Sequence, residues 1–303
     1  MTPAARAHAG AIAAVGAGAL LLGVGPILVR LSEVGPQATA AWRFIFALPV
    51  LALIALSTRR NRTPPNPQTL GVLAIAGVAF GLDIALWHAS LFFTTVTNAT
   101  LFSNMTPVLA AAAGWIFFRE RVGWGFAAGA GASILGAAAL AYSRAQGGRG
   151  DFSGDGLALF AAVWYAVYLV LMRGARRETP AAQAMFWTTS AALGVALTSS
   201  LLFGDVMLPQ TLKGWAVLAG LGLIVQVGGQ GLIAVGLGRL PIALSTVLLW
   251  LQPLAAAALS WILFGEALAP LGIAGAALIL LGVWIVQTRG ASKEKLATAE
   301  QGA

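Results

Sequence analysis

The stretch Asn104–Val122, NMTPVLAAAAGWIFFRERV, is repeated 146 residues later as Trp250–Leu268, WLQPLAAAALSWILFGEAL. Each copy places a proline thirteen residues before a glutamate, and eight of the fourteen positions from that proline to that glutamate are identical. Further along the chain, Gly129 matches Gly275 at the same offset. We therefore interpret the chain as two related halves, each ending in the same pair of helices.

The composition places these halves in a membrane. The 303 residues are 59% hydrophobic and only 9% charged, whereas soluble domains carry roughly 25% charged residues. The apolar runs are continuous and about 20 residues long, which is the length that an α-helix needs to cross a bilayer. A transmembrane barrel instead shows alternating segments of about ten residues. The sequence predicts an all-α integral membrane protein in contact with the lipid bilayer.

Ten such runs occur, so we expect ten transmembrane helices. They form a first five-helix repeat in residues 1–145 and a second in residues 150–289, followed by a cytoplasmic tail in residues 290–303. The segments Arg62–Gln68, Gln146–Gly156 and Gly238–Pro241 contain the prolines and glycines expected of connections. The expected spans are 11–29, 36–57, 69–91, 97–118, 122–142, 153–173, 180–203, 211–237, 241–264 and 268–288.

The positions of the basic residues predict the topology. With both termini in the cytoplasm, thirteen of the eighteen Lys and Arg residues lie in inner segments and four lie in outer loops. This bias obeys the positive-inside rule. Because five helices are an odd number, the second half is inverted relative to the first. The rule then explains why Arg119 and Arg121 follow the first copy of the repeated stretch while no arginine follows the second.

Inverted repeats are typical of secondary transporters, in which two halves exchange outward-open and inward-open states. The sequence disfavours other classes. It has no cysteine and only two histidines, so we expect no disulfide, no metal site and no cofactor. The basic residues lie in short loops, which argues against nucleic-acid binding. No phosphate-binding, zinc-protease or serine-hydrolase motif indicates an enzyme, although a channel stays an alternative.

These features resemble the drug/metabolite transporter superfamily, EamA type, over about residues 10 to 289. The resemblance rests on the ten helices, the two halves and the proline–glutamate spacing that ends the fourth helix of each half. Within that superfamily the chain looks most similar to YddG-type exporters of aromatic amino acids. The resemblance implies export of small metabolites from the cytoplasm through a central cavity, by a monomer in the bacterial inner membrane. Threonine or homoserine, cysteine and cationic drugs are the alternative cargoes.

Three ionisable residues fall inside expected spans, where charges are costly and often functional. Arg43 and Asp83 lie at equal depth, so they form either a structural ion pair or a group used in gating or proton coupling. His88 follows Trp87 near the end of its helix. We expect it to anchor that helix or to donate a hydrogen bond, with proton transfer as the alternative.

Aromatic side chains on the span 153–173 suggest a binding surface. Trp164 and Tyr168 are four residues apart and share a helix face, with Tyr165 beside them. All three lie near the middle of the membrane rather than at its surface, where Trp and Tyr usually collect. They either line a cavity that stacks on planar cargo or pack in an ordinary core, and Trp250 is a further candidate.

Two amides on the span 211–237 complete the predicted site. Gln226 and Gln230 are four residues apart and offer donors and acceptors without net charge, which suits the ammonium and carboxylate of an amino acid. The alternative is that they link neighbouring helices. Asn98 is a weaker candidate of the same kind. We also expect Gly25-Pro26 to interrupt the first helix, either to expose backbone or to permit packing.

Overall fold

The computed structural model describes residues 3–58, 65–90, 123–142, 152–264 and 270–300, together with residues 93, 102–103, 105–106, 109–110, 113 and 116–117. Every regular element in these ranges is helical. The elements are α1 (Pro3–Leu22), α2 (Gly25–Arg30), α3 (Pro36–Thr58), α4 (Pro67–Ser90), α7 (Trp124–Tyr142), α8 (Phe152–Ala175), α9 (Ala181–Phe203), α10 (Leu212–Gly220), η2 (Leu221–Gln230), α11 (Gly231–Leu237), α12 (Ile242–Leu248), α13 (Leu251–Phe264) and α14 (Pro270–Glu300).

Within the described ranges, seven helical segments are long and apolar enough to cross a membrane. Two further expected spans correspond to the shorter apolar segments Trp124–Ala139 and Pro270–Ile285. Most of the expected span 97–118 lies outside the described residues. Large apolar side chains also cover the outer surface, where Leu202, Trp124 and Leu212 are at least 80% exposed. Such a surface matches a lipid environment, so the chain is a multi-pass helical membrane protein.

Two expected spans are broken within the membrane, and the sequence explains both breaks. The first span separates into α1 and α2 at Gly23 and Val24, just before Gly25-Pro26. A Cβ on Gly23 would lie 2.5 Å from the Cβ of Ala255 in α13. The glycine at this break therefore lets α13 approach closely. The ninth span separates into α12 and α13 because the ring of Pro253 clashes with a continuing helix four residues earlier.

The eighth span is the least regular, because its centre is a ten-residue π-helix, η2. π-Helical turns are rare and often occur at functional sites. Glycines let neighbours approach η2: a Cβ on Gly222 would lie 3.0 Å from the carbonyl oxygen of Arg43 in α3. A Cβ on Gly18 of α1 would lie 2.7 Å from the carbonyl oxygen of Gly229. Gly18 and Gly229 thus permit close packing of α1 on η2.

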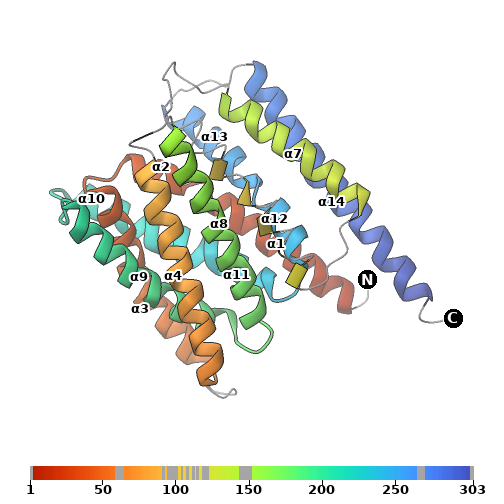
Figure 1. Ribbon diagram of the computed structural model, residues 1–303, viewed down its shortest axis with the longest axis horizontal. Helices are drawn as coiled ribbons and strands as arrows, with labels where there is room; N and C mark the ends of the chain where they lie inside the picture. Colours follow the sequence, from red (N-terminus) through yellow and green to blue (C-terminus); the bar gives the residue numbers. More distant parts are fainter. Residues whose placement is uncertain are drawn as a thin grey trace.

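Helices α7 and α14 pack side by side along one edge of the molecule (Figure 1). A Cβ on Gly136 would lie 2.5 Å from the carbonyl oxygen of Gly275, and a Cβ on Gly282 would collide with that of Gly129. At the offset of 146, Gly129 corresponds to Gly275 and Gly136 corresponds to Gly282. The two contacts are therefore equivalent: Gly136 meets Gly275, and its counterpart Gly282 meets Gly129. Because higher numbers in one helix meet lower numbers in the other, α7 and α14 run antiparallel.

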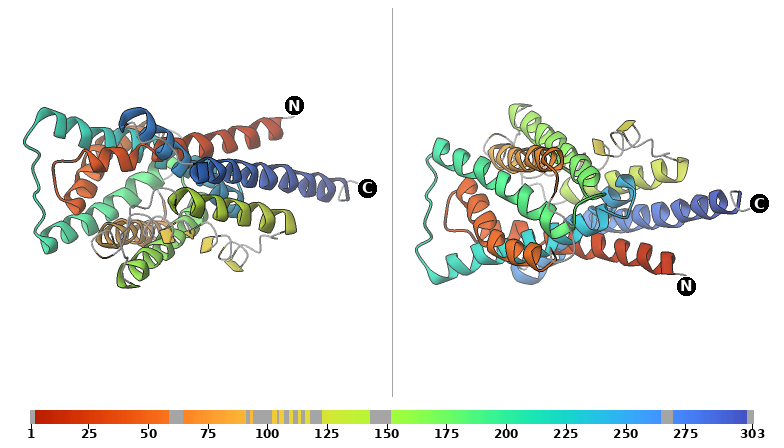
Figure 2. Two further views of the ribbon diagram at one scale, coloured as in Figure 1. Left: turned by 90° about the horizontal axis from the view of Figure 1, so that it is seen from above. Right: turned by 90° about the horizontal axis from the view of Figure 1, so that it is seen from below.

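The remaining helices surround the apolar interior. Buried side chains of α3, α4, α8, α9 and η2 form the larger cluster, and a smaller one lies between α1, α7, α12 and α14. The described beginning of α1 and the described end of α14 lie at the same end of the molecule (Figures 1 and 2). This arrangement is compatible with the expectation that both termini lie on one side of the membrane, which stays a prediction.

Candidate functional site

Polar side chains from five helical elements meet at the middle of the larger cluster. We call this set the central layer; it comprises Arg43 of α3, Asp83 of α4, Tyr165 of α8, Thr189 of α9, and Gln226 and Gln230 of η2. Five of these six residues come from the sequence-based candidates. Gln226, Gln230 and Thr189 are buried, whereas Arg43, Asp83 and Tyr165 keep part of their surface accessible.

A chain of hydrogen bonds holds Arg43 in place. Its Nε donates to Oε1 of Gln226 at 2.9 Å, and Nε2 of Gln226 donates to the Thr189 hydroxyl at 3.0 Å. The amide is thereby fixed in one orientation, with its oxygen toward the guanidinium. Among the described residues only Nε of Arg43 is engaged, so its terminal nitrogens are available for a bidentate contact with a carboxylate.

Asp83 provides the second ionisable group of the central layer. It interacts electrostatically with Arg43, but the two side chains form no direct salt bridge, and the hydrogen bond described for Arg43 goes to Gln226. The expected pairing of Arg43 with Asp83, and its role in gating, therefore stay predictions. In this conformation the carboxyl group of Asp83 is a separate polar group near the guanidinium.

Gln230 and Tyr165 connect η2 to α8. Nε2 of Gln230 donates to the Tyr165 hydroxyl at 3.3 Å. Oε1 of Gln230 is buried without a hydrogen-bond partner among the described residues. Buried acceptors are normally paired, so this oxygen is positioned to accept a hydrogen bond from a bound molecule.

Aromatic rings form one wall of the central layer. Phe80 of α4 stacks on Tyr168 with ring centroids 4.8 Å apart, and Tyr168 stacks on Tyr165 at 5.7 Å. The guanidinium carbon of Arg43 lies 5.8 Å from the centre of the Phe80 ring, within cation–π range. Tyr168 is fully buried, and its hydroxyl makes only a weak contact with the sulfur of Met185 at 3.8 Å.

Five other candidates lie apart from this layer or outside the described residues. Trp164 packs edge-on against Phe160 of its own helix. Trp250 is buried in the smaller apolar cluster. Trp87 contacts the ring of His88, which is buried and interacts with the backbone of Pro36 at the start of α3. This position favours an anchoring role for His88. Asn98 lies outside the described residues.

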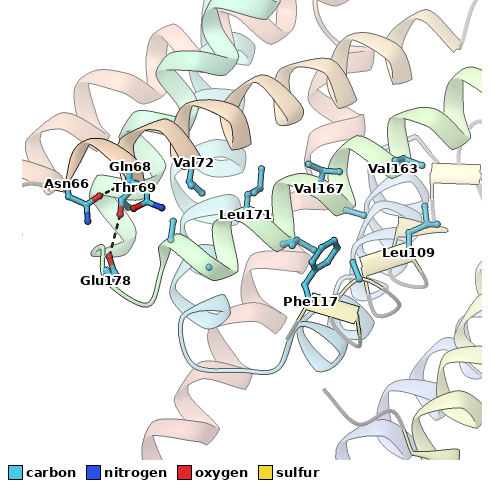
Figure 3. Close-up of a pocket in the computed structure, with 15 residues that line it drawn as sticks. Asn66, Gln68, Thr69, Val72, Leu109, Phe117, Val163, Val167, Leu171 and Glu178 are labelled. Atoms are coloured by element: carbon cyan, nitrogen blue, oxygen red, sulfur yellow. Dashed lines mark hydrogen bonds between the residues drawn. The ribbon is translucent and has the colours of Figure 1, made fainter. Parts of the chain in front are cut away.

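A cavity of about 680 Å³ lies between α4, α8 and the side chains of Leu109, Ala113 and Phe117. One end is polar, with Asn66, Gln68, Thr69 and Glu178, and the remainder is lined by apolar side chains such as Val167 (Figure 3). Its walls come from both halves of the chain. By helical periodicity, the face of α8 that lines the cavity lies opposite the face that carries Tyr165 and Tyr168.

Sequence reasoning missed two members of this region, although each leaves a signal. Phe80 lies three residues before Asp83 and so shares its helix face. Thr189 is one of two adjacent threonines near the middle of a predicted span, and a buried hydroxyl there needs a partner. These local signals do not identify the neighbouring helices, because the packing of α3, α9 and η2 decides which residues meet.

The fold and the central layer define a helical membrane protein with a polar, aromatic interior site. Comparison with known sequences places it more closely. The EamA-like transporter family matches the chain twice, over residues 8–142 and 152–288. This chain belongs to the EamA-like transporter family.

Individual relatives carry names of transporters. A "Probable terminal-alkyne amino-acid exporter" of Streptantibioticus cattleyicolor is 24% identical over 90% of this chain and 91% of its own length. A "Probable biotin transporter" of Pseudomonas aeruginosa is 33% identical over 53% of this chain, and a "Biotin transporter" of Escherichia coli is 26% identical over 58%. These two matches span 57% and 59% of the biotin transporters.

A solved crystal structure confirms the fold. It covers 91% of this chain and 98% of its own, with a TM-score of 0.78 at 21% sequence identity. At this identity the likeness concerns the fold alone. The resemblance to the EamA-type superfamily is therefore confirmed, and the finer resemblance to aromatic amino-acid exporters stays a prediction.

Proposed function

We propose that this chain is a secondary transporter that exports small metabolites bearing a carboxylate, amino acids and their analogues foremost, by alternating access. The two repeats would span the bacterial inner membrane as ten helices in opposite orientation, with both termini in the cytoplasm. The reciprocal glycine contacts of antiparallel α7 and α14 support this arrangement, since equivalent positions meet across a two-fold relation. The protein would act as a monomer.

The observation that carries the cargo class is the fixed guanidinium of Arg43 in the middle of the bundle. Its bond to Gln226 orients it, and its free donors suit a carboxylate. The unpaired oxygen of Gln230 suits an ammonium or amide donor on the same molecule. The ring of Tyr165, which keeps part of its surface accessible, suits a planar or apolar side group. An amino acid combines these three features.

A second candidate cargo is biotin, because the relative with 33% identity is named a biotin transporter. Biotin also carries a carboxylate, and its cyclic urea offers both donors and acceptors to Gln230. Both candidates would bind Arg43 through a carboxylate, and they differ in the group that would contact the aromatic rings. Threonine, homoserine, cysteine and cationic drugs remain the other cargoes to test.

Counterflow in proteoliposomes tests the proposal. Vesicles loaded with unlabelled amino acid should accumulate the same labelled amino acid, with saturation and stereoselectivity, and biotin and a cationic dye serve as competing cargoes. Arg43→Gln should abolish uptake of carboxylate cargo, while Arg239→Gln, at a loop position, should preserve it. Ohmic current without saturation would identify a channel instead. Equal transport of a carboxylate and of its amide would reject the assigned cargo class.

A further inference from the structure

Glu33 joins the two halves at one end of the bundle. It lies in the connection between α2 and α3, and its carboxylate accepts hydrogen bonds from the backbone N–H groups of Gln210 and Thr211 at 2.9 and 3.0 Å. The Thr211 hydroxyl donates a third. These donors stand at the beginning of α10, so Glu33 caps a helix of the other half.

Further contacts close the same end. Oδ2 of Asp205 accepts a hydrogen bond from the backbone N–H of Ala38 at 2.8 Å, and Nε1 of Trp42 donates to the carbonyl of Met207 at 2.6 Å. The ring of Trp42 also meets that of Trp215 edge-on, with centroids 4.8 Å apart. The connection before α3 and the first turns of α3 are thus bound to the connection before α10.

Glu178 occupies the corresponding place at the other end. It lies in the connection between α8 and α9, which are the first and second helices of the second half. Its carboxylate meets the beginning of α4, the third helix of the first half, where it accepts one hydrogen bond from the Thr69 hydroxyl at 3.4 Å. Thr69 and Glu178 both line the cavity, with Asn66 beside them (Figure 3).

The two carboxylates therefore hold reciprocal positions. Each follows the first helix of its own half and reaches the first turn of the third helix in the other half. They precede Pro36 and Pro180, which stand at the beginnings of the second helices. The contacts differ in strength, because Glu33 has three donors, whereas Glu178, which lines a cavity, has one long contact among the described residues.

Resting on the alternating access proposed above, we propose that Glu33 and Glu178 are the two gate carboxylates of the transport cycle and that they engage alternately. In the present conformation the Glu33 contact is closed, and the Glu178 contact is loosened to one long hydrogen bond with Thr69. In the opposite conformation Glu178 binds the first turn of α4 while Glu33 leaves α10. Under the expected topology, the first state opens to the cytoplasm and the second opens to the outside.

Site-directed labelling tests this directly, because the natural chain has no cysteine. Phe46→Cys, beside the ring of Trp215, reports opening at the Glu33 end, and Val72→Cys, in the cavity, reports opening at the Glu178 end. The rate of reaction with a membrane-impermeant maleimide is measured from each side of oriented vesicles. Glu33→Gln should raise the rate at residue 46 and lower it at residue 72, each about two- to fivefold, as expected for exposed polar contacts.

Glu178→Gln added to the Glu33→Gln variant should reverse both changes, because it weakens the opposite gate. Thr211→Val should act like Glu33→Gln, since it removes a donor from the same contact. Glu294→Gln in the tail is the matched control and should change neither rate. Changes of equal sign at residues 46 and 72, or no reversal by Glu178→Gln, would overturn the assignment of the gates.

The readout is independent of the cargo. Opposite shifts in labelling together with absent flux would reject the proposed transport but retain the gates. Saturable flux together with unchanged labelling would retain the transporter and reject these two residues as gates.

Discussion

Arg43 of α3 and Gln226 of η2 are joined by a 2.9 Å hydrogen bond from Nε to Oε1. Gln226 stands in the π-helical part of its span, and its amide nitrogen is held by Thr189. The acceptor of the Arg43 guanidinium thus comes from the π-helical part of its span, and Thr189 of α9 fixes its orientation. Four predictions follow from this and other contacts.

Gln226→Leu should weaken cargo binding more than Thr189→Val. The leucine leaves Nε of Arg43 without its acceptor, and an unsatisfied buried polar group costs about 1–3 kcal/mol. We expect at least a tenfold loss of apparent affinity for a carboxylate cargo, on the order of 1.4 kcal/mol. The valine removes only the group that orients the amide, so a smaller loss is expected. Counterflow at varied cargo concentration measures both, and equal affinities in the two variants would contradict the assigned roles.

The two tyrosines of α8 should differ in their response to loss of the hydroxyl. Tyr165→Phe removes the acceptor of the Gln230 amide nitrogen, and because Oε1 of Gln230 is already unpaired, neither polar atom of that amide then has a partner. Tyr168→Phe removes only a long contact with the Met185 sulfur and leaves the ring stack intact. We expect Tyr165→Phe to lower cargo affinity about three- to tenfold, the range for a net hydrogen bond, and Tyr168→Phe to leave it nearly unchanged. A larger effect of Tyr168→Phe in isothermal titration would reverse the two roles.

Acid should release the contact of Glu33 with α10. The Thr211 hydroxyl, followed by the backbone N–H groups and Lys213, holds the pKa of the Glu33 carboxyl below its ordinary value of 4.5. Its ionised form therefore stabilises the closed contact above the ordinary pKa, and this contribution is lost as the pH falls through the lowered pKa. Labelling at Phe46→Cys should accelerate as the pH on the Glu33 side falls below 4.5, after correction for the reactivity of the thiol. Glu33→Gln should abolish that acceleration, and its persistence would point to another group.

Two glycines of α7 should respond in opposite directions to alanine. A Cβ on Gly136 would press into the backbone of α14, whereas nothing lies within 4 Å of a Cβ on Gly131. Overpacking costs about 1–3 kcal/mol, while replacing an unhindered helix glycine by alanine stabilises by roughly 0.5–1 kcal/mol. Thermal unfolding in detergent should therefore show a lower midpoint for Gly136→Ala and an equal or higher one for Gly131→Ala. A similar decrease in both variants would remove packing against α14 as the cause.

The sequence predicted the helices and the repeat because both depend on local signals. Long apolar runs identify spans, and the proline–glutamate spacing aligns the halves. Gly23 and Pro253 mark breaks that follow from local chemistry. The π-helical turns of η2 were not predicted, because Gln226 and Gln230 are four residues apart and read equally well as neighbours on an α-helix.

The partners within the central layer were harder to predict than its members. Equal depth made Asp83 a candidate partner for Arg43, but depth says nothing about which helices are neighbours. Helix α3 packs mainly on α9 and η2, so Gln226 reaches the guanidinium first. Trp250 was expected near the cargo because it is a large aromatic residue within a span, yet the turn between α12 and α13 carries it into the smaller apolar cluster.

The contact between α7 and α14 is self-complementary, because Gly136 packs on Gly275 in the same way that its counterpart Gly282 packs on Gly129. A single half thus already contains both surfaces of this seam. Half-length chains inserted in both orientations would be able to dimerise through it, which describes how an ancestral gene could have served as a homodimer before duplication and fusion joined its two copies.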